Sequence, residues 1–422
     1  MSGPSGAARS HKAPLLLALG VLILFLDGYD LFVFGAAAPA MLEYEAWEVT
    51  PVTVGLIGSI TTLGMPLGAI STGYAADVYG RRLPIIVSLI WVSACMFASF
   101  LAPSLEFFMA TRFAVGLGLG ALIPLTCAFV NDWAPEGRRA FYTGTALTGV
   151  AFGGLAASFT ARALLPEVHF QWLFFFGCLP LVLVPVVWRL LPAGLPARDP
   201  ADATEPSSAD QGSGQEKSKI RQIFAPGLAR ATIAFWVATF LGLILVNGAS
   251  TWLPTLMVNS GYDIRSSLEF AVTFNIGAIV GTLGATLIAD RGSLKWVTVV
   301  SFVFAAISMF VLSTPQPRVL LLLMAAVAGL GALGTQNLIN AYVGQYYPAR
   351  VRGTALGFSL GVGRLGSIAG PSYLAAVTVL FVNPDAGFYA FMIPALLGAL
   401  VIATVPFRGR TKPVTAGSTK GE

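Results

Sequence analysis

Apolar runs of about twenty residues recur along the whole chain and are separated by short polar stretches. An α-helix of about 20 apolar residues is long enough to cross the hydrocarbon core of a bilayer. We therefore predict twelve transmembrane helices, over residues 14–40, 52–76, 84–102, 106–130, 139–163, 170–191, 229–257, 266–289, 296–313, 317–345, 354–381 and 386–407. Runs this long and continuous exclude the strands of a membrane barrel. The predicted fold class is an all-α polytopic membrane protein.

Residues 192–228 form the one long connection, and their Pro, Ala, Ser, Asp and Gly content is typical of a linker. The parts on either side echo each other at an offset of 213 residues, in Ala76-Asp77 and Ala289-Asp290, in Pro135 and Pro348, and in Arg139 and Arg352. Such repeats predict two pseudo-symmetric six-helix bundles. We expect an N-terminal bundle in residues 1–191, a cytoplasmic linker in 192–228, and a C-terminal bundle with a short cytoplasmic tail in 229–422.

Composition and charge place these helices in a membrane and give them an orientation. Hydrophobic residues make up 56% of the chain and charged residues 11%, against about 25% charged in a soluble domain. If both termini are cytoplasmic, 20 of the 25 Lys and Arg residues lie on that side, as the positive-inside rule requires. We expect a monomer in the lipid bilayer of a bacterial inner membrane. The pI of 9.2 reflects these loops, so a nucleic-acid partner is rejected.

The residue types that carry most enzyme chemistry do not gather in the predicted spans. The three cysteines lie in apolar runs without metal-ligand spacing, and the two histidines lie away from the membrane centre. The sequence contains no Gly-rich phosphate-binding motif. We therefore expect neither an enzyme nor a cofactor or metal site, and ATP-driven transport is disfavoured.

Two carboxylates, Asp27 and Asp30, lie in the middle of the first predicted span. An aspartate at the bilayer centre costs about 3 kcal/mol on insertion scales and usually faces a water-filled pathway. Three residues apart, the two acids share one face of a helix. Since burial and mutual repulsion favour protonation, we predict that this pair couples transport to protons.

The stretch Gly73-Tyr-Ala-Ala-Asp77-Val-Tyr-Gly80-Arg81-Arg82, after the second span, resembles the loop signature of the major facilitator superfamily. Val78 stands where that family usually has a basic residue. The resemblance covers nearly the whole chain and implies two six-helix bundles that rock about a central site. A cytoplasmic gate of ion pairs at the inner ends of the spans is the corresponding prediction for Asp77, Arg81, Arg82, Asp132, Arg139 and Arg352. Simple topology anchors and solvated loops are the alternative.

A handful of charged positions narrows the resemblance. Asp27 and Asp30 in the first span, Arg112 in the fourth, and Arg352 and Arg364 in the eleventh resemble the aromatic acid:proton symporter family, which includes 4-hydroxybenzoate and benzoate carriers. That family implies inward, proton-coupled transport of aromatic carboxylates such as 4-hydroxybenzoate, protocatechuate or benzoate, in which the acids of span one and the arginines of span eleven are important.

Each of the two intramembrane arginines has two possible roles. A rise of 1.5 Å per residue puts Arg112 about 9 Å and Asp30 about 15 Å from the outer membrane face, within reach of one arginine side chain. Their pair is either a fixed link between spans or a proton-sensitive one. Arg364 lies about 18 Å beyond Arg352 among glycines, where it binds the substrate carboxylate or pairs with Asp27.

Polar and aromatic residues within the spans are candidates for contact with the substrate ring. Tyr29 is the first candidate for stacking because it lies between the two acids. The others, with Arg112 and Arg364 as charged contacts, are Phe32, Asn247, Trp252, Asn275, Gln336 and Asn340. Each amide alone is also typical of a hydrogen bond between helices. Because a midplane arginine suits any carboxylate, a muconate-like diacid or a sugar acid is the alternative substrate.

Overall fold

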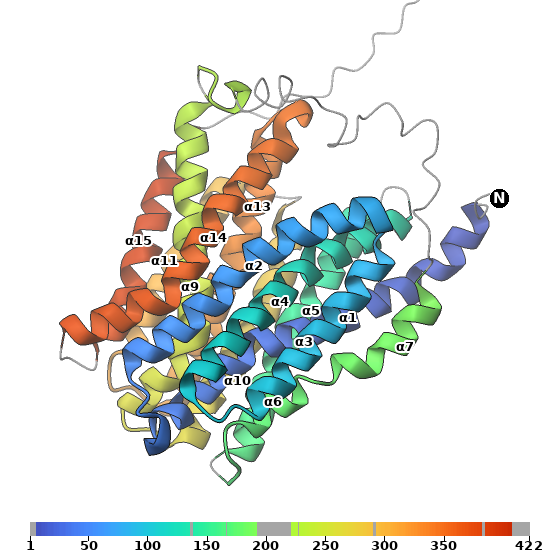
Figure 1. Ribbon diagram of the computed structural model, residues 1–422. Coiled ribbons are helices and arrows are strands. Elements are labelled where there is room, and N and C mark those ends of the chain that lie inside the picture. The colour runs from blue at the N-terminus through green and yellow to red at the C-terminus, as the bar shows by residue number, and fades with distance from the viewer. Residues whose placement is uncertain are drawn as a thin grey trace, which may run out of the picture.

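The computed structural model describes residues 6–135, 138–165, 167–191, 221–226, 228–289, 293–381 and 385–406. These residues form a helical protein without strands (Figure 1). The N-terminal half contains α1 (Gly6–Leu42), η1 (Glu45–Trp47), α2 (Pro51–Tyr79), α3 (Arg82–Phe100), α4 (Leu105–Trp133), α5 (Arg139–Leu164), α6 (Trp172–Phe176) and α7 (Pro180–Leu190). The C-terminal half contains α9 (Ala229–Asn259), α10 (Ile264–Ala289), α11 (Leu294–Leu312), α12 (Arg318–Gly329), η3 (Leu330–Gly334), α13 (Thr335–Tyr346), α14 (Ala349–Leu380) and α15 (Ala386–Thr404).

The helices confirm the predicted all-α membrane fold. Eleven candidate spans among the described residues are long and apolar enough to cross a membrane. The predicted eleventh span is α14, which is 32 residues long but carries three arginines and many small residues, and so falls short on hydropathy. The proposed linker, 192–228, lies largely outside the described residues.

Two predicted spans are not uniform helices. The sixth is divided into α6 and α7 at residues 177–179, immediately before Pro180. The tenth runs through α12, the π-helical turn η3 and α13. Hydrophobicity reports the length of a span but not these interruptions, because residues 177–179 and 330–334 contain no charged or polar side chain that would mark a break.

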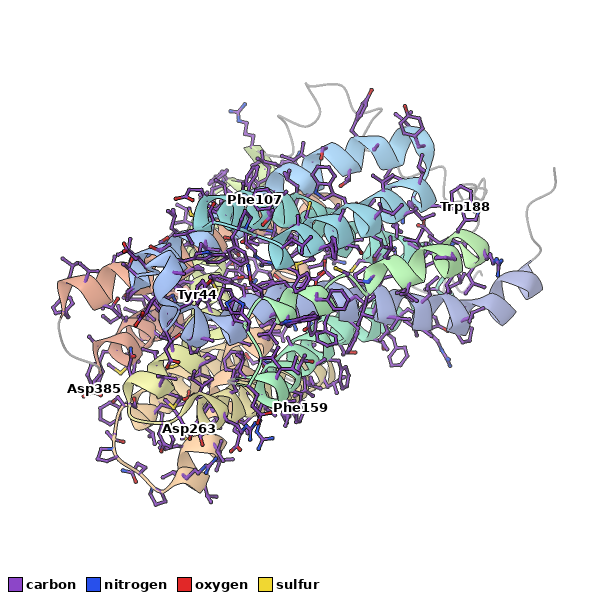
Figure 2. The ribbon with its side chains drawn as sticks, turned by 60° about the horizontal axis from the view of Figure 1, so that its bottom comes forward. Tyr44, Phe107, Phe159, Trp188, Asp263 and Asp385 are labelled. Carbon is purple, nitrogen blue, oxygen red and sulfur yellow. The ribbon has the colours of Figure 1, made fainter. Side chains whose placement is uncertain are left out.

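Glycines set how closely neighbouring helices approach within each half. A Cβ atom on Gly28 of α1 would lie 2.1 Å from the main-chain oxygen of Val150 on α5. A Cβ atom on Gly277 of α10 would lie 1.8 Å from the main-chain oxygen of Ala326 on α12. Lipid chains are as apolar as the helix surfaces, so van der Waals contact at small residues supplies much of the packing energy. Exposed aromatic side chains such as Phe107, Phe159 and Trp188 cover the outside of the protein (Figure 2).

The two halves meet along α1–α9, α2–α14 and α5–α10. We call the membrane face at which α1 begins and α15 ends the terminal face, and the face at which α1 ends the far face. The contact of α2 with α14 runs from Gly55 beside Ala375, near the far face, to Met65 beside Arg364. Continued toward the terminal face, the same antiparallel alignment would pair Gly73 with Gly357, yet a Cβ atom added to either glycine would meet nothing within 4 Å. The halves are therefore in contact near the far face and separate toward the terminal face.

We predict that Gly277→Ala lowers the stability of the purified protein because the added methyl group cannot fit between α10 and α12. Overpacking of this kind costs about 1–3 kcal/mol. Gly284→Ala is the matched control in the same helix, since a Cβ atom there meets nothing within 4 Å. Thermal unfolding in detergent should show a lower midpoint for Gly277→Ala alone. Equal midpoints for the two variants would contradict this account of the packing.

Candidate functional site

The centre of the N-terminal half holds two buried carboxylates. Asp27 and Asp30 are 1% and 0% exposed. Among the described residues, no hydrogen-bond donor reaches any of their four carboxylate oxygens. Because α1 packs tightly on α5 at Gly28, the helix cannot easily move these acids toward water. Two acids are thus held in a place where charge is costly.

Arg112 on α4 is the neighbour of Asp30, as predicted, but it does not contact the carboxylate. Its guanidinium donates to the main-chain oxygen of Asp30 at 3.4 Å and to the sulfur of Met96 at 3.4 Å. It also lies 5.7 Å and 5.6 Å from the ring centres of Phe34 and Phe174. No described carboxylate forms an ion pair with it within 4.0 Å. Arg112 therefore acts on Asp30 through space and holds the main chain at this acid.

The division between α6 and α7 lies against Asp30. A Cβ atom on Gly177 would stand 2.5 Å from Oδ1 of Asp30 and 2.2 Å from Cε of Met96. The hydroxyl of Tyr29 donates to the main-chain oxygen of Leu173 on α6 at 3.0 Å. The main chain between α6 and α7 therefore lies directly against Asp30. Tyr29 packs inside the N-terminal half.

Arg364 on α14 is the charge that the C-terminal half contributes. Its Nη1 lies 3.6 Å from the sulfur of Met65 on α2, at the point where the contact of the two halves ends. Asp27 is close enough to interact with it electrostatically across the halves, although no described carboxylate lies within 4.0 Å of it. Arg364 is partly exposed. This guanidinium is available to an anion that enters between the halves.

The predicted ring contacts separate into two groups. Asn247 donates to the hydroxyl of Ser367, and the indole of Trp252 donates to the main-chain oxygen of Pro371 at 2.9 Å. Both bonds join α9 to α14 within the C-terminal half, and Gln336 donates to Asn340 at 3.3 Å on one face of α13.

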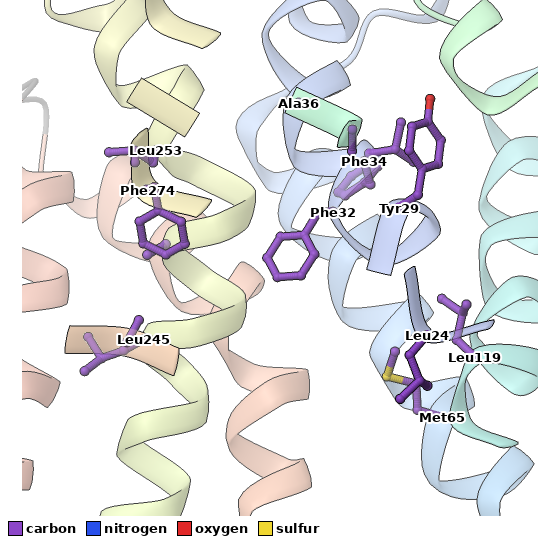
Figure 3. Packing of buried hydrophobic residues seen from close by; sticks show 14 of the residues in the cluster. Leu24, Tyr29, Phe32, Phe34, Ala36, Met65, Leu119, Leu245, Leu253 and Phe274 are labelled. Atoms are coloured by element: carbon purple, nitrogen blue, oxygen red, sulfur yellow. The ribbon is translucent and has the colours of Figure 1, made fainter. Parts of the chain in front are cut away.

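Phe32 and Asn275 instead line a small pocket between the halves. In Figure 3, Phe32 extends from α1 toward Phe274 and Leu253, whereas Tyr29 lies on another side of α1. Asn275 donates to the hydroxyl of Ser158 on α5 at 3.2 Å. These two residues are therefore the candidates that the fold places where the halves meet.

The predicted cytoplasmic gate is described only in part. Arg81 forms an ion pair with Asp132 at 2.7 Å, inside the N-terminal half. Arg82 donates to the main-chain oxygen of Trp188 and lies 4.3 Å from its ring centre. Arg352 is exposed, and Asp77 and Arg139 lie outside the described side chains. A gate between the halves at this face stays a prediction.

Sequence reasoning missed the ion pairs of the far face. Glu269 on α10 accepts from Arg162 on α5 at 2.8 Å and from Arg318 on α12. Arg265 pairs with Glu167 at 2.9 Å. Two of these three pairs join the halves where they are closed. The only sequence signal was the presence of acids and bases together at the outer ends of predicted spans, which does not reveal partners.

Two helical halves, with two buried acids in one and a partly exposed arginine facing them from the other, define a membrane carrier of the alternating-access type. Residues 20–371 match the Major Facilitator Superfamily, and the chain belongs to it. It is 31% identical to a benzoate transport protein of Acinetobacter baylyi, covering 94% of this chain and 90% of the relative. It is also 31% identical to a gentisate transporter of Corynebacterium glutamicum, covering 94% and 88%. The crystal structure of a D-xylose-proton symporter shares the fold, with a TM-score of 0.77, 16% identity and coverage of 94% and 98%.

We predict that Glu269→Gln opens the far face, because it weakens the pair with Arg162, which joins the halves, at an acid that Arg318 also holds in place. Ser250→Cys, at the pocket between the halves, in a variant that lacks the three native cysteines serves as the reporter. Losing about 1 kcal/mol of ion pairing should raise its alkylation rate by about fivefold.

Glu167→Gln is the matched control, since its pair with Arg265 is more exposed and should change the rate by less than about twofold. The reagent is a membrane-impermeant maleimide, and the rate is measured in intact cells and in inverted vesicles. An unchanged rate in Glu269→Gln would show that these pairs do not hold the halves together.

Proposed function

We propose that this protein is a secondary active transporter that carries aromatic carboxylates into the cell together with protons. The observation that carries the proposal is the position of Arg364, which contacts Met65 of the opposite half where the two halves part and is partly exposed. The full-length similarity to transporters named for benzoate and gentisate supports an aromatic acid as substrate. The superfamily fold supports alternating access.

The substrate carboxylate replaces an interaction that Arg364 makes with Asp27. A planar guanidinium binds a carboxylate through two parallel hydrogen bonds. The contact of Nη1 with the sulfur of Met65 leaves N–H donors of Arg364 available for such a pair. Phe32 supplies an aromatic wall between the halves. In this scheme, the anion enters at the open side and draws Arg364 away from Asp27.

The proton neutralises the negative charge of Asp27, which loses the interaction with Arg364 when the substrate binds. When Arg364 binds the anion, Asp27 keeps neither a donor nor its electrostatic partner. A proton on Asp27 or Asp30 removes that buried charge and lets the halves close over a neutral site. Coupling therefore arises because the loaded, unprotonated carrier is the costly state.

The orientation follows from the charge distribution and from the separation of the halves. The predicted cytoplasmic loops and termini hold 20 of the 25 basic residues, so we place both termini and the linker in the cytoplasm of an inner-membrane protein. The halves are joined at the far face and separate at the terminal face, which corresponds to an inward-open state. The proposed bundles are residues 1–191 and 229–422, and the monomer is the transporting unit.

Uptake of labelled acids into cells, with and without a protonophore, tests the function. We expect uptake of benzoate, 4-hydroxybenzoate or protocatechuate that the protonophore abolishes. Muconate is the non-aromatic competitor in the same assay. Uptake of muconate without any aromatic acid would overturn the substrate class and leave the fold intact.

We predict that Asp27→Asn with Asp30→Asn binds substrate but loses accumulation driven by a pH gradient, because neither amide can take up a transported proton. Binding is measured by calorimetry in detergent and accumulation in proteoliposomes. Counterflow exchange at equal pH is the control, since it needs a working site but no gradient. Full accumulation in the double variant would refute coupling through these acids.

We predict that Arg364→Lys raises KM for the acid by about tenfold or more, because an ammonium keeps the charge but cannot make the paired hydrogen bonds. Arg230→Lys, at the exposed start of α9, is the matched control and should leave KM unchanged. An unchanged KM in Arg364→Lys would mean that the carboxylate is bound elsewhere.

A further inference from the structure

One polar atom in the pocket between the halves has no hydrogen-bond partner within the described part of the chain. The pocket lies among α1, α5, α9 and α10 and is lined in part by Phe32, Ser158, Ser250, Phe274 and Asn275. Asn275 is 3% exposed, and its Oδ1 accepts no hydrogen bond from any described residue. A buried acceptor without a donor is rare and costly.

The orientation of the Asn275 amide is fixed by its other contacts. Nδ2 lies 2.9 Å from the main-chain oxygen of Ala271, which can only accept, so the nitrogen must be on that side. The same nitrogen donates to the hydroxyl of Ser158, whose own proton goes to the main-chain oxygen of Gly154. Ser158 therefore cannot supply the missing donor to Oδ1.

The space around this oxygen is kept open by a glycine. A Cβ atom on Gly154 would lie 2.5 Å from Oδ1 of Asn275 and 2.9 Å from the ring of Phe32. The free volume of the pocket is about 10 Å³, which is room for about one water molecule. A hydroxyl group has the size of that water and carries the donor that Oδ1 lacks.

The distance of the pocket from Asp27 along α1 matches the length of a substituted benzoate from its carboxyl group to the para substituent. Phe32 is five residues from Asp27 along α1, an axial distance of about 7.5 Å. Arg364 acts at the level of Asp27, and Asn275 lies beside Phe32. One benzene ring spans a comparable distance between a carboxyl group and a substituent in the para position.

We propose that Asn275 is a specificity-determining residue, which reads a ring hydroxyl through Oδ1 while Arg364 holds the carboxylate. This inference rests on the proposed transport of aromatic carboxylates. It implies that acids with a para-hydroxyl group are preferred to the unsubstituted acid. It also implies that a ring substituent unable to donate a hydrogen bond is not accepted in its place. A site whose acceptor stays unpaired discriminates against an analogue that lacks the donor.

The test measures uptake of 4-hydroxybenzoate, benzoate and 4-methoxybenzoate by the full-length protein and by Asn275→Leu. We expect the wild type to prefer 4-hydroxybenzoate by roughly tenfold or more in the ratio of maximal rate to KM. In Asn275→Leu that preference should fall to about twofold or less, with benzoate uptake retained. The ratio between acids is the readout, because a merely structural effect lowers all three together.

A second variant and a control keep the test decisive. Gly154→Ala, which places a methyl group against Oδ1, should also abolish the preference, so the test does not depend on Asn275→Leu folding well. Asn337→Leu is the matched control, since its amide bonds Thr282 within the C-terminal half and its ratio should equal that of the wild type.

The outcomes distinguish this inference from the function on which it rests. Equal uptake of benzoate and 4-hydroxybenzoate by the wild type would overturn the role of Asn275 and leave the transporter intact. A preference that persists in both Asn275→Leu and Gly154→Ala would do the same. Uptake of muconate without any aromatic acid would overturn both proposals.

Discussion

The burial of two carboxylates on one membrane helix is the constraint on which the rest of this structure depends. Each intramembrane acid costs about 2.5–3.5 kcal/mol on insertion scales, and no described donor offsets that cost at Asp27 or Asp30. The close approach of α1 and α5 at Gly28 prevents relief by a shift of the helix. While the acids are charged, compensation comes through space, from Arg112 in the same half and Arg364 in the other. The charge balance of one half is therefore tied to the position of its partner.

The internal repeat supplies the scaffold but not the chemistry. At the offset of 213 residues, Asp27 corresponds to Phe240, and Arg364 corresponds to Ala151. The helices are thus duplicated, whereas Asp27 belongs to one copy and Arg364 to the other. The electrostatic interaction between unlike charges in the two halves depends on how the halves are placed relative to each other. Two identical halves would carry the same charges, so they could not attract each other in this way. This asymmetry is what lets a rocking motion change the electrostatics of the site.

The position of Arg364 along α14 links the site to the state of the carrier. Toward the far face, α2 and α14 are joined by hydrogen bonds such as that of Ser59 with Ser372 at 2.7 Å. Toward the terminal face, Gly73 of α2 and Gly357 of α14 face open space. Arg364 lies at the boundary between these regions. A ligand bound there touches the end of the contact between α2 and α14, so binding and rocking involve the same residues.

The sequence by itself determined the membrane class, the helical spans, the two-fold repeat and the charged residues that matter, because each depends on local composition and spacing. Burial cost identified Asp27, Asp30, Arg112 and Arg364, since an ionisable residue in an apolar run stands out in any fold. Only the tertiary structure decided which groups meet. It showed that Arg112 bonds the main chain of Asp30 and that Tyr29 turns into its own half. It also showed that Oδ1 of Asn275, between the halves, accepts no hydrogen bond from the residues that the structure describes, because the partners of a polar side chain are set by helix packing and by glycines far away in the chain.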